Sequence, residues 1–104
     1  MQEHALANLG SLVSQAEVLR TRSLGLMQAG PDAPVGERDL RAYAELHAAA
    51  MDACGVDGPV SLAAVDPPDE LGSVARLHRS AGLLEHELLV RLARARTAAR
   101  RAGG

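Results

Sequence analysis

The chain has 104 residues, 47% of them apolar, and a formal net charge of −2 at pH 7. This length suits one domain with a single core, and the apolar share excludes a chain that stays disordered. The nearly balanced charge excludes a global field that would attract the whole molecule to nucleic acid or to a membrane.

The apolar residues are mostly leucine, alanine and valine, with no isoleucine, phenylalanine or tryptophan and with Tyr43 as the single aromatic residue. Because leucine and alanine favour helix and strand-forming residues are few, we expect an all-α protein. The one cysteine, Cys54, cannot form an internal disulfide bond, and no apolar run is long enough for a signal peptide or a membrane span. The expected location is therefore the cytoplasm, with no membrane partner.

The first predicted helix runs from about Glu3 to Ala29. Small and apolar residues three or four positions apart form one face of it: Ala5, Leu9, Leu12, Ala16, Leu19, Ser23 and Leu26. This spacing predicts a core-facing bundle helix, with a self-pairing coiled-coil seam as the alternative. Gly10 and Gly25 interrupt the helix, and close approach of a neighbouring helix would explain them. Gly30 and Pro31 then end it, and a loop follows to Gly36.

The second predicted helix runs from about Glu37 to Cys54. Glu37 and Asp39 lie in its first turn, where negative charge suits the positive end of the helix dipole. Gly55 follows at the position of a left-handed C-terminal cap. The spacing predicts an inward stripe made of Leu40, Tyr43, His47, Ala50, Met51 and Cys54.

A third and longest helix is predicted to begin at Asp66 and to reach Arg101. Asp66 can cap the first turn, and the prolines after it are tolerated there. The short segment from Val60 to Val65 is predicted as one more helical turn. We therefore expect one domain over residues 1–104, a bundle of three long helices with a short fourth segment and a frayed tail at 102–104. The third helix has an apolar stripe of Leu71, Val74, Leu77, Ala81, Leu84, Leu88, Leu92, Ala95 and Ala99.

The helix lengths predict a second copy of the chain as a partner. At about 1.5 Å per residue, the second helix is too short to cover the third. Exposed apolar surface of that extent usually marks an interface, and pairing of two long helices in a homodimer would cover it. The predicted interface is Leu84, Leu88, Leu92, Ala95 and Ala99.

Charge is distributed unevenly along the chain. Residues 32–70 have nine acidic residues and two arginines, a net charge of −7, whereas residues 71–104 have seven arginines and two glutamates, a net charge of +5. An acidic protein surface suits the basic end better than a polyanion, which the acids would repel. Nucleic acid is the alternative partner, although no aromatic residue is available there to stack on bases. The arginines concerned are Arg91, Arg94, Arg96, Arg100 and Arg101.

A metal site between the second and third helices is the sharpest chemical hypothesis, with His47, Cys54, His78 and Glu85 as ligands. The Glu-x-x-His pair of carboxylate-bridged metal bundles is absent, however, so hydrogen-bonded histidines are the preferred interpretation and no cofactor is expected. Cys54 would lie at a helix C-terminus, which disfavours a reactive thiolate. The sequence contains no Gly-rich phosphate loop, Gly-x-Ser-x-Gly or Cys-x-x-Cys motif.

These observations favour a non-enzymatic protein–protein interaction module, a small regulator or adaptor, that forms a homodimer through its C-terminal helix and binds a second, unidentified protein. A nucleic-acid-associated regulator that uses the C-terminal arginines is the first alternative. A metal-binding helical bundle is the second.

Overall fold

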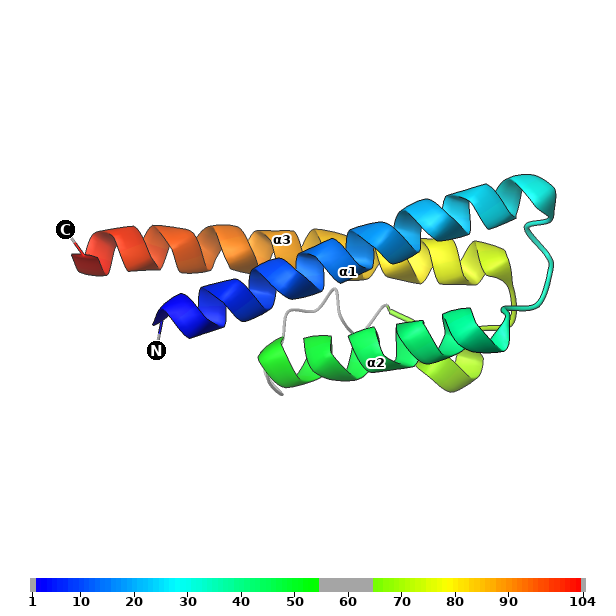
Figure 1. Ribbon diagram of the computed structural model, residues 1–104, viewed down its shortest axis with the longest axis horizontal. Coiled ribbons are helices and arrows are strands. Elements are labelled where there is room, and N and C mark those ends of the chain that lie inside the picture. Colours follow the sequence, from blue (N-terminus) through cyan, green and yellow to red (C-terminus); the bar gives the residue numbers. More distant parts are fainter. Residues whose placement is uncertain (1, 55–64, 104) are drawn as a thin grey trace.

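Figure 1 shows a computed structural model of the chain, which describes residues 2–54 and 65–103, without the side chains of residues 2–6 and 54. The described part has three α-helices, α1 (Gln2–Ala29), α2 (Glu37–Cys54) and α3 (Val74–Gly103), and a short 3₁₀ helix, η2 (Pro68–Glu70). It contains no strand. The predicted all-α architecture is confirmed, and α3, with 30 residues, is the longest helix. The helical turn predicted at 60–65 lies almost entirely outside the described residues.

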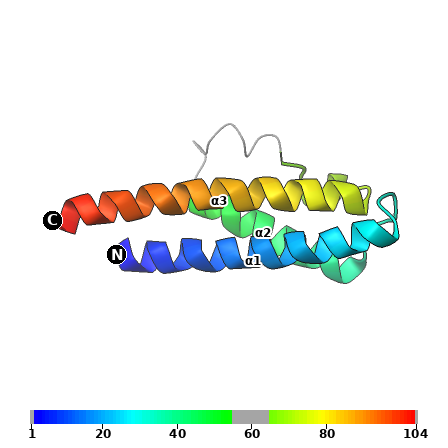
Figure 2. The same cartoon turned by 90° about the horizontal axis from the view of Figure 1, so that it is seen from above.

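The two long helices, α1 and α3, run antiparallel side by side, and the shorter α2 packs against one side of this pair (Figure 1). Figure 2 shows the same pairing from above, with α2 behind the two long helices. The molecule is elongated, with principal dimensions of 50 × 24 × 19 Å. Its core lies where the three helices meet. The buried apolar residues are Leu12, Ala16, Leu19, Tyr43, Leu46, Ala50, Val65, Val74, Leu77, Ala81, Leu84, Leu88 and Leu92.

The helix α3 begins eight residues later than predicted, at Val74 rather than at Asp66. The two prolines permit only the short turn η2, and Gly72 separates that turn from the helix. Asp66 does not cap α3: its carboxylate accepts hydrogen bonds from Arg76 at 3.2 Å and from the Ser80 hydroxyl at 3.5 Å. The side chain that caps α3 is Ser73, whose Oγ accepts a hydrogen bond from the Arg76 backbone N–H at 3.3 Å.

The loop between α1 and α2 is tied to the first turn of α3. The backbone N–H of Val74 donates to the Ala33 carbonyl at 2.9 Å, and that of Ala75 donates to the Pro31 carbonyl at 3.0 Å. These N–H groups belong to the first turn of a helix, where no carbonyl of the helix itself is available. The loop therefore fixes the end of the α1–α3 pair at which α3 starts.

The inward face of α2 differs from the prediction. Met51 is exposed and Leu46 is buried, so the stripe turns toward Tyr43, Leu46 and Ala50. A second difference concerns α1, where a Cβ atom added at Gly10 or Gly25 would meet open space. Close approach of a neighbouring helix, one of the possible explanations of these two glycines, is therefore not the reason for them.

The apolar stripe of α3 is covered within a single chain, contrary to the expectation that much of it would stay exposed. Leu84, Leu88 and Leu92 are buried, and only Ala95 and Ala99 are half-buried. The physical reason is that α1, with 28 residues, is almost as long as α3 and lies beside it. The prediction from the sequence took α2 as the helix that covers this stripe, and α2 is too short to do so. The apolar argument for a homodimer therefore fails for these three leucines.

Candidate functional site

A groove of about 550 Å³ lies between α1 and α2 and is open to solvent. We call it the α1/α2 groove. No periodic pattern in the sequence predicts this groove, because its existence depends on how α2 packs beside α1. The residues that line it are Ser11, Ser14, Gln15, Val18, Leu19 and Arg22 from α1, and Arg38, Asp39, Ala42, Glu45 and Leu46 from α2.

Four of the six α1 residues that line the groove are polar or charged, and Val18 and Leu19 are the two apolar ones. Leu19 and Leu46 are buried at its base, with 5% and 2% of their surface exposed. Val18 is the exception on the rim, with 67% of its surface exposed. A β-branched apolar residue outside the core stripe was the one feature of the sequence that could have indicated this surface.

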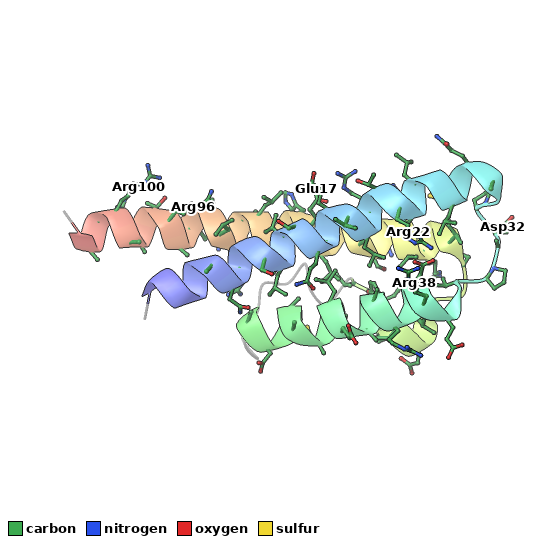
Figure 3. All side chains as sticks on the ribbon, viewed as in Figure 1. Glu17, Arg22, Asp32, Arg38, Arg96 and Arg100 are labelled. Atoms are coloured by element: carbon green, nitrogen blue, oxygen red, sulfur yellow. The ribbon has the colours of Figure 1, made fainter. Side chains whose placement is uncertain are left out.

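An ion pair connects the two walls at one end of the groove. The Arg22 guanidinium Nε donates to Asp39 Oδ1 at 2.5 Å, and the mostly buried carboxylate of Asp39 thereby joins α2 to α1. This hydrogen bond and the opposite charge raise the pKa of Arg22 above its ordinary value. Figure 3 shows Arg22 and Arg38 in this region, between the two helices. The groove thus has an apolar base and charged residues on its rim.

Two of the proposed metal ligands, His78 and Glu85, instead connect α3 to Arg20 of α1. The Glu85 carboxylate accepts a hydrogen bond from Arg20 Nε at 2.7 Å. His78 Nδ1 lies 3.2 Å from the Arg20 carbonyl oxygen and 3.0 Å from the hydroxyl of buried Ser23. Both side chains therefore serve the packing of α1 against α3.

The other two proposed ligands, His47 and Cys54, lie on α2. The His47 ring is tilted against the Tyr43 ring, with 5.9 Å between the ring centroids. The side chain of Cys54 is outside the described part of the structure. Among the side chains that are described, no group of three or more histidines, cysteines and acids is arranged to hold a metal ion.

Acidification should destabilise the protein through His47. Partial burial lowers the pKa of His47 below its ordinary value of 6.5. The folded state therefore binds this proton less tightly than the unfolded state does, and the stabilisation present above about pH 6.5 is lost as the pH falls through the lower, folded-state pKa. We expect His47→Gln to lower the melting temperature at pH 7.5 and to reduce its fall between about pH 7 and pH 5.

Thermal unfolding followed by circular dichroism measures this difference. If the melting temperature fell equally steeply with pH in the wild type and in His47→Gln, a partly buried, neutral His47 would be contradicted. Stoichiometric zinc, iron or copper in the wild-type protein, lost in His47→Gln, would assign His47 to a metal site instead.

The arginines of the C-terminal part of α3 divide into two groups. Arg91 is half-buried, with its Nε atom 4.0 Å from Glu87 Oε1. Glu87 itself is buried, with 5% of its surface exposed. The remaining four are exposed, and no ion pair joins them to a carboxylate in the described residues. We call these four the arginine end: Arg94, Arg96, Arg100 and Arg101.

Comparison with known protein families, with curated proteins and with solved structures finds no match to this chain. None of the helices in the described ranges is both long and apolar enough to cross a lipid bilayer. The roles of the α1/α2 groove and of the arginine end therefore follow from their geometry and charge alone.

Proposed function

We propose that the chain is a non-enzymatic protein–protein interaction module, a regulator or adaptor, whose α1/α2 groove accepts an amphipathic helix of a partner protein. The observation that supports this best is the position of Val18, which is two-thirds exposed beside the buried Leu19 and Leu46 in an open groove. Helices that dock in such grooves do so through apolar anchors spaced three or four residues apart. Val18 would pack against one of these anchors.

The shape of the groove suits a helix. α1 and α2 run in opposite directions along its two sides (Figure 1), so a helix laid between them would extend the bundle from three helices to four. Ser14 and Gln15 on one rim and Glu45 on the other would provide hydrogen bonds at the border of the contact. An apolar centre with a polar rim is the usual anatomy of a protein interface.

The polar groups of the groove favour binding over catalysis. Gln15 Nε2 donates to Ser11 Oγ at 3.3 Å, and Arg22 and Asp39 bind each other, so these groups hold one another in place. No histidine or cysteine is among the lining residues. A nucleophile with an adjacent general base, which acyl-transfer enzymes require, is absent from this lining.

The proposal places the protein in the cytoplasm, in keeping with its single cysteine. It does not depend on a homodimer. The three leucines of α3 that motivated dimerisation are buried within one chain, and the partner proposed for the groove is a different protein.

Photo-crosslinking can test the groove against a matched position on the same helix. A photoreactive amino acid replaces either Val18, in the groove, or Leu24, which is 44% exposed on α1 but does not line the groove. In cells that naturally produce the protein, we expect a crosslinked partner from position 18 and not from position 24. The crosslinked peptide should map to an amphipathic helix.

The mapped peptide, made synthetically, then gives an affinity. Because Val18 is the exposed apolar residue that the partner helix would pack against, Val18→Glu should weaken binding by about tenfold or more, whereas Leu24→Glu should change it little. Circular dichroism should show both variants folded, since both side chains are solvent-exposed. Equal crosslinking from both positions, or equal affinities of the two variants, would refute the groove as the binding site.

A further inference from the structure

The arginine end is an unneutralised cluster of positive charge. In the described residues two exposed arginines, Arg38 and Arg79, form no ion pair, and five others, the last of them Arg91, pair with carboxylates. The next four along α3 have none. Complementing the helix dipole accounts only for Arg100 and Arg101, which lie in the last turn. Arg94 and Arg96 lie one to two turns earlier, where the effect of the dipole has faded.

Three of the unpaired acids lie at the opposite end of the molecule. Asp32 lies in the loop that is hydrogen-bonded to the first turn of α3, and Asp69 and Glu70 lie in η2, just before that turn. All three are exposed and make no ion pair with the described residues. We call these three the acidic end. Figure 3 shows Asp32 and the pair Arg96 and Arg100 at opposite extremes of the long axis.

We propose that the arginine end docks on the acidic end of a second copy of this chain, in an antiparallel dimer with two-fold symmetry. The molecule is 50 Å long, with positive charge at one end and negative charge at the other. Two copies side by side in opposite directions satisfy both ends of both molecules at once, and the symmetry closes the assembly. In a head-to-tail pair, only one arginine end meets an acidic end, and the other end of each molecule stays unpaired.

The acidic end also makes a second copy a better partner than nucleic acid. A polyanion attracted to the arginine end is repelled by Asp32, Asp69 and Glu70 and by the other acids of residues 32–70. No aromatic side chain lies beside the arginines to stack on bases, since the only one in the chain is Tyr43 in the core. The proposal is independent of the α1/α2 groove, because neither end contributes a residue to the lining of that groove.

Ionic strength provides the first test. Sedimentation equilibrium of the full chain at about 100 μM should show dimers at about 20 mM salt and monomers at about 500 mM, because salt screens exposed charges. The dissociation constant of the dimer should rise at least about tenfold over this range. Monomers at both salt concentrations, or growth beyond the dimer at low salt, would overturn the two-fold arrangement.

Charge reversal provides the second test, with two complementary variants. One replaces the arginine end (R94E, R96E, R100E and R101E), and the other replaces the acidic end (D32R, D69R and E70R). Each variant alone should remain monomeric at about 20 mM salt, because like charges then face each other at both contacts. An equimolar mixture should form a 1:1 heterodimer, because opposite charges face each other again at both contacts.

Circular dichroism shows whether the variants are folded, and R94Q, R96Q, R100Q and R101Q replace the first set if glutamates near the end of α3 disturb the helix. With the glutamine set the mixture should dimerise more weakly than the wild type but more strongly than either variant alone. A mixture that stays monomeric would refute the proposal. Submicromolar binding of duplex DNA or RNA by the wild type at about 150 mM salt, lost in the arginine variant, would assign the arginine end to nucleic acid instead.

Discussion

Replacing Leu88 with glutamate should unfold the protein. Leu88, on α3, has 0% of its surface exposed and belongs to the buried apolar core. An unpaired carboxylate at that position costs several kcal/mol, and the packing of the leucine is lost as well. Domains of this size have only about 5–15 kcal/mol of stability in total. We therefore expect the variant to lose most of its helical circular dichroism at 25 °C.

The neighbouring residue supplies the control. Leu89 is 45% exposed, so Leu89→Glu should change the free energy of unfolding by about 0.5 kcal/mol or less. Urea unfolding of both variants and the wild type measures the difference. If Leu88→Glu were a stable, folded monomer while the wild type was a dimer, the leucine stripe would form an interface between chains, as its sequence pattern first suggested.

Raising the pH above 10 should destabilise the protein through Tyr43. Burial raises the pKa of Tyr43 from its ordinary value of 10.0 to about 12. The folded state therefore holds the phenolic proton more tightly than the unfolded state does. This stabilisation is fully present below about pH 10 and is lost as the pH rises toward 12, which amounts to about 2–3 kcal/mol over that interval.

The single tyrosine makes the measurement unambiguous. The ultraviolet absorbance of the phenolate should give a titration midpoint of about 12 in the folded protein and of about 10 in urea. Tyr43→Phe should remove most of the pH dependence of stability in this range. It should also lower stability at neutral pH by about 1 kcal/mol, since the Tyr43 hydroxyl donates to the Asp66 carbonyl. A midpoint near 10 in the folded protein would contradict the burial of this hydroxyl.

The helices themselves could be predicted because their signals are local. Gly30 and Pro31 end α1 where expected, and Glu37 begins α2 where expected. The start of α3 could not be predicted, because two local patterns competed there. Asp66, Pro67 and Pro68 have the composition of a helix start. The helix begins only after Gly72, however, and Ser73 caps its first turn. Tertiary contacts decide between the two patterns, because Asp66 is hydrogen-bonded to Tyr43 and Arg76 and does not cap the helix.

The candidate sites show a second limit of prediction from the sequence. The periodicity of Leu84, Leu88 and Leu92 correctly indicated a buried face, but it does not say which helix covers that face. The α1/α2 groove depends on the position of α2 relative to α1, and a pattern within one helix contains no information about it. The arginine end was visible in the sequence, because a run of like charges needs no tertiary contact to be recognised.

The pairing of the first helix with the last one has a consequence for synthesis on the ribosome. The core faces of α1, which include Ala16, are buried largely by α3, which includes Leu88. At roughly 5–20 residues per second, Ala16 is made about 4–14 s before Leu88 is made. During this interval α1 has only the short α2 to cover it, and the contacts between α1 and α3 form late because they join residues far apart in the sequence. The nascent chain thus exposes the apolar face of α1 until α3 has been synthesised and can pack against it.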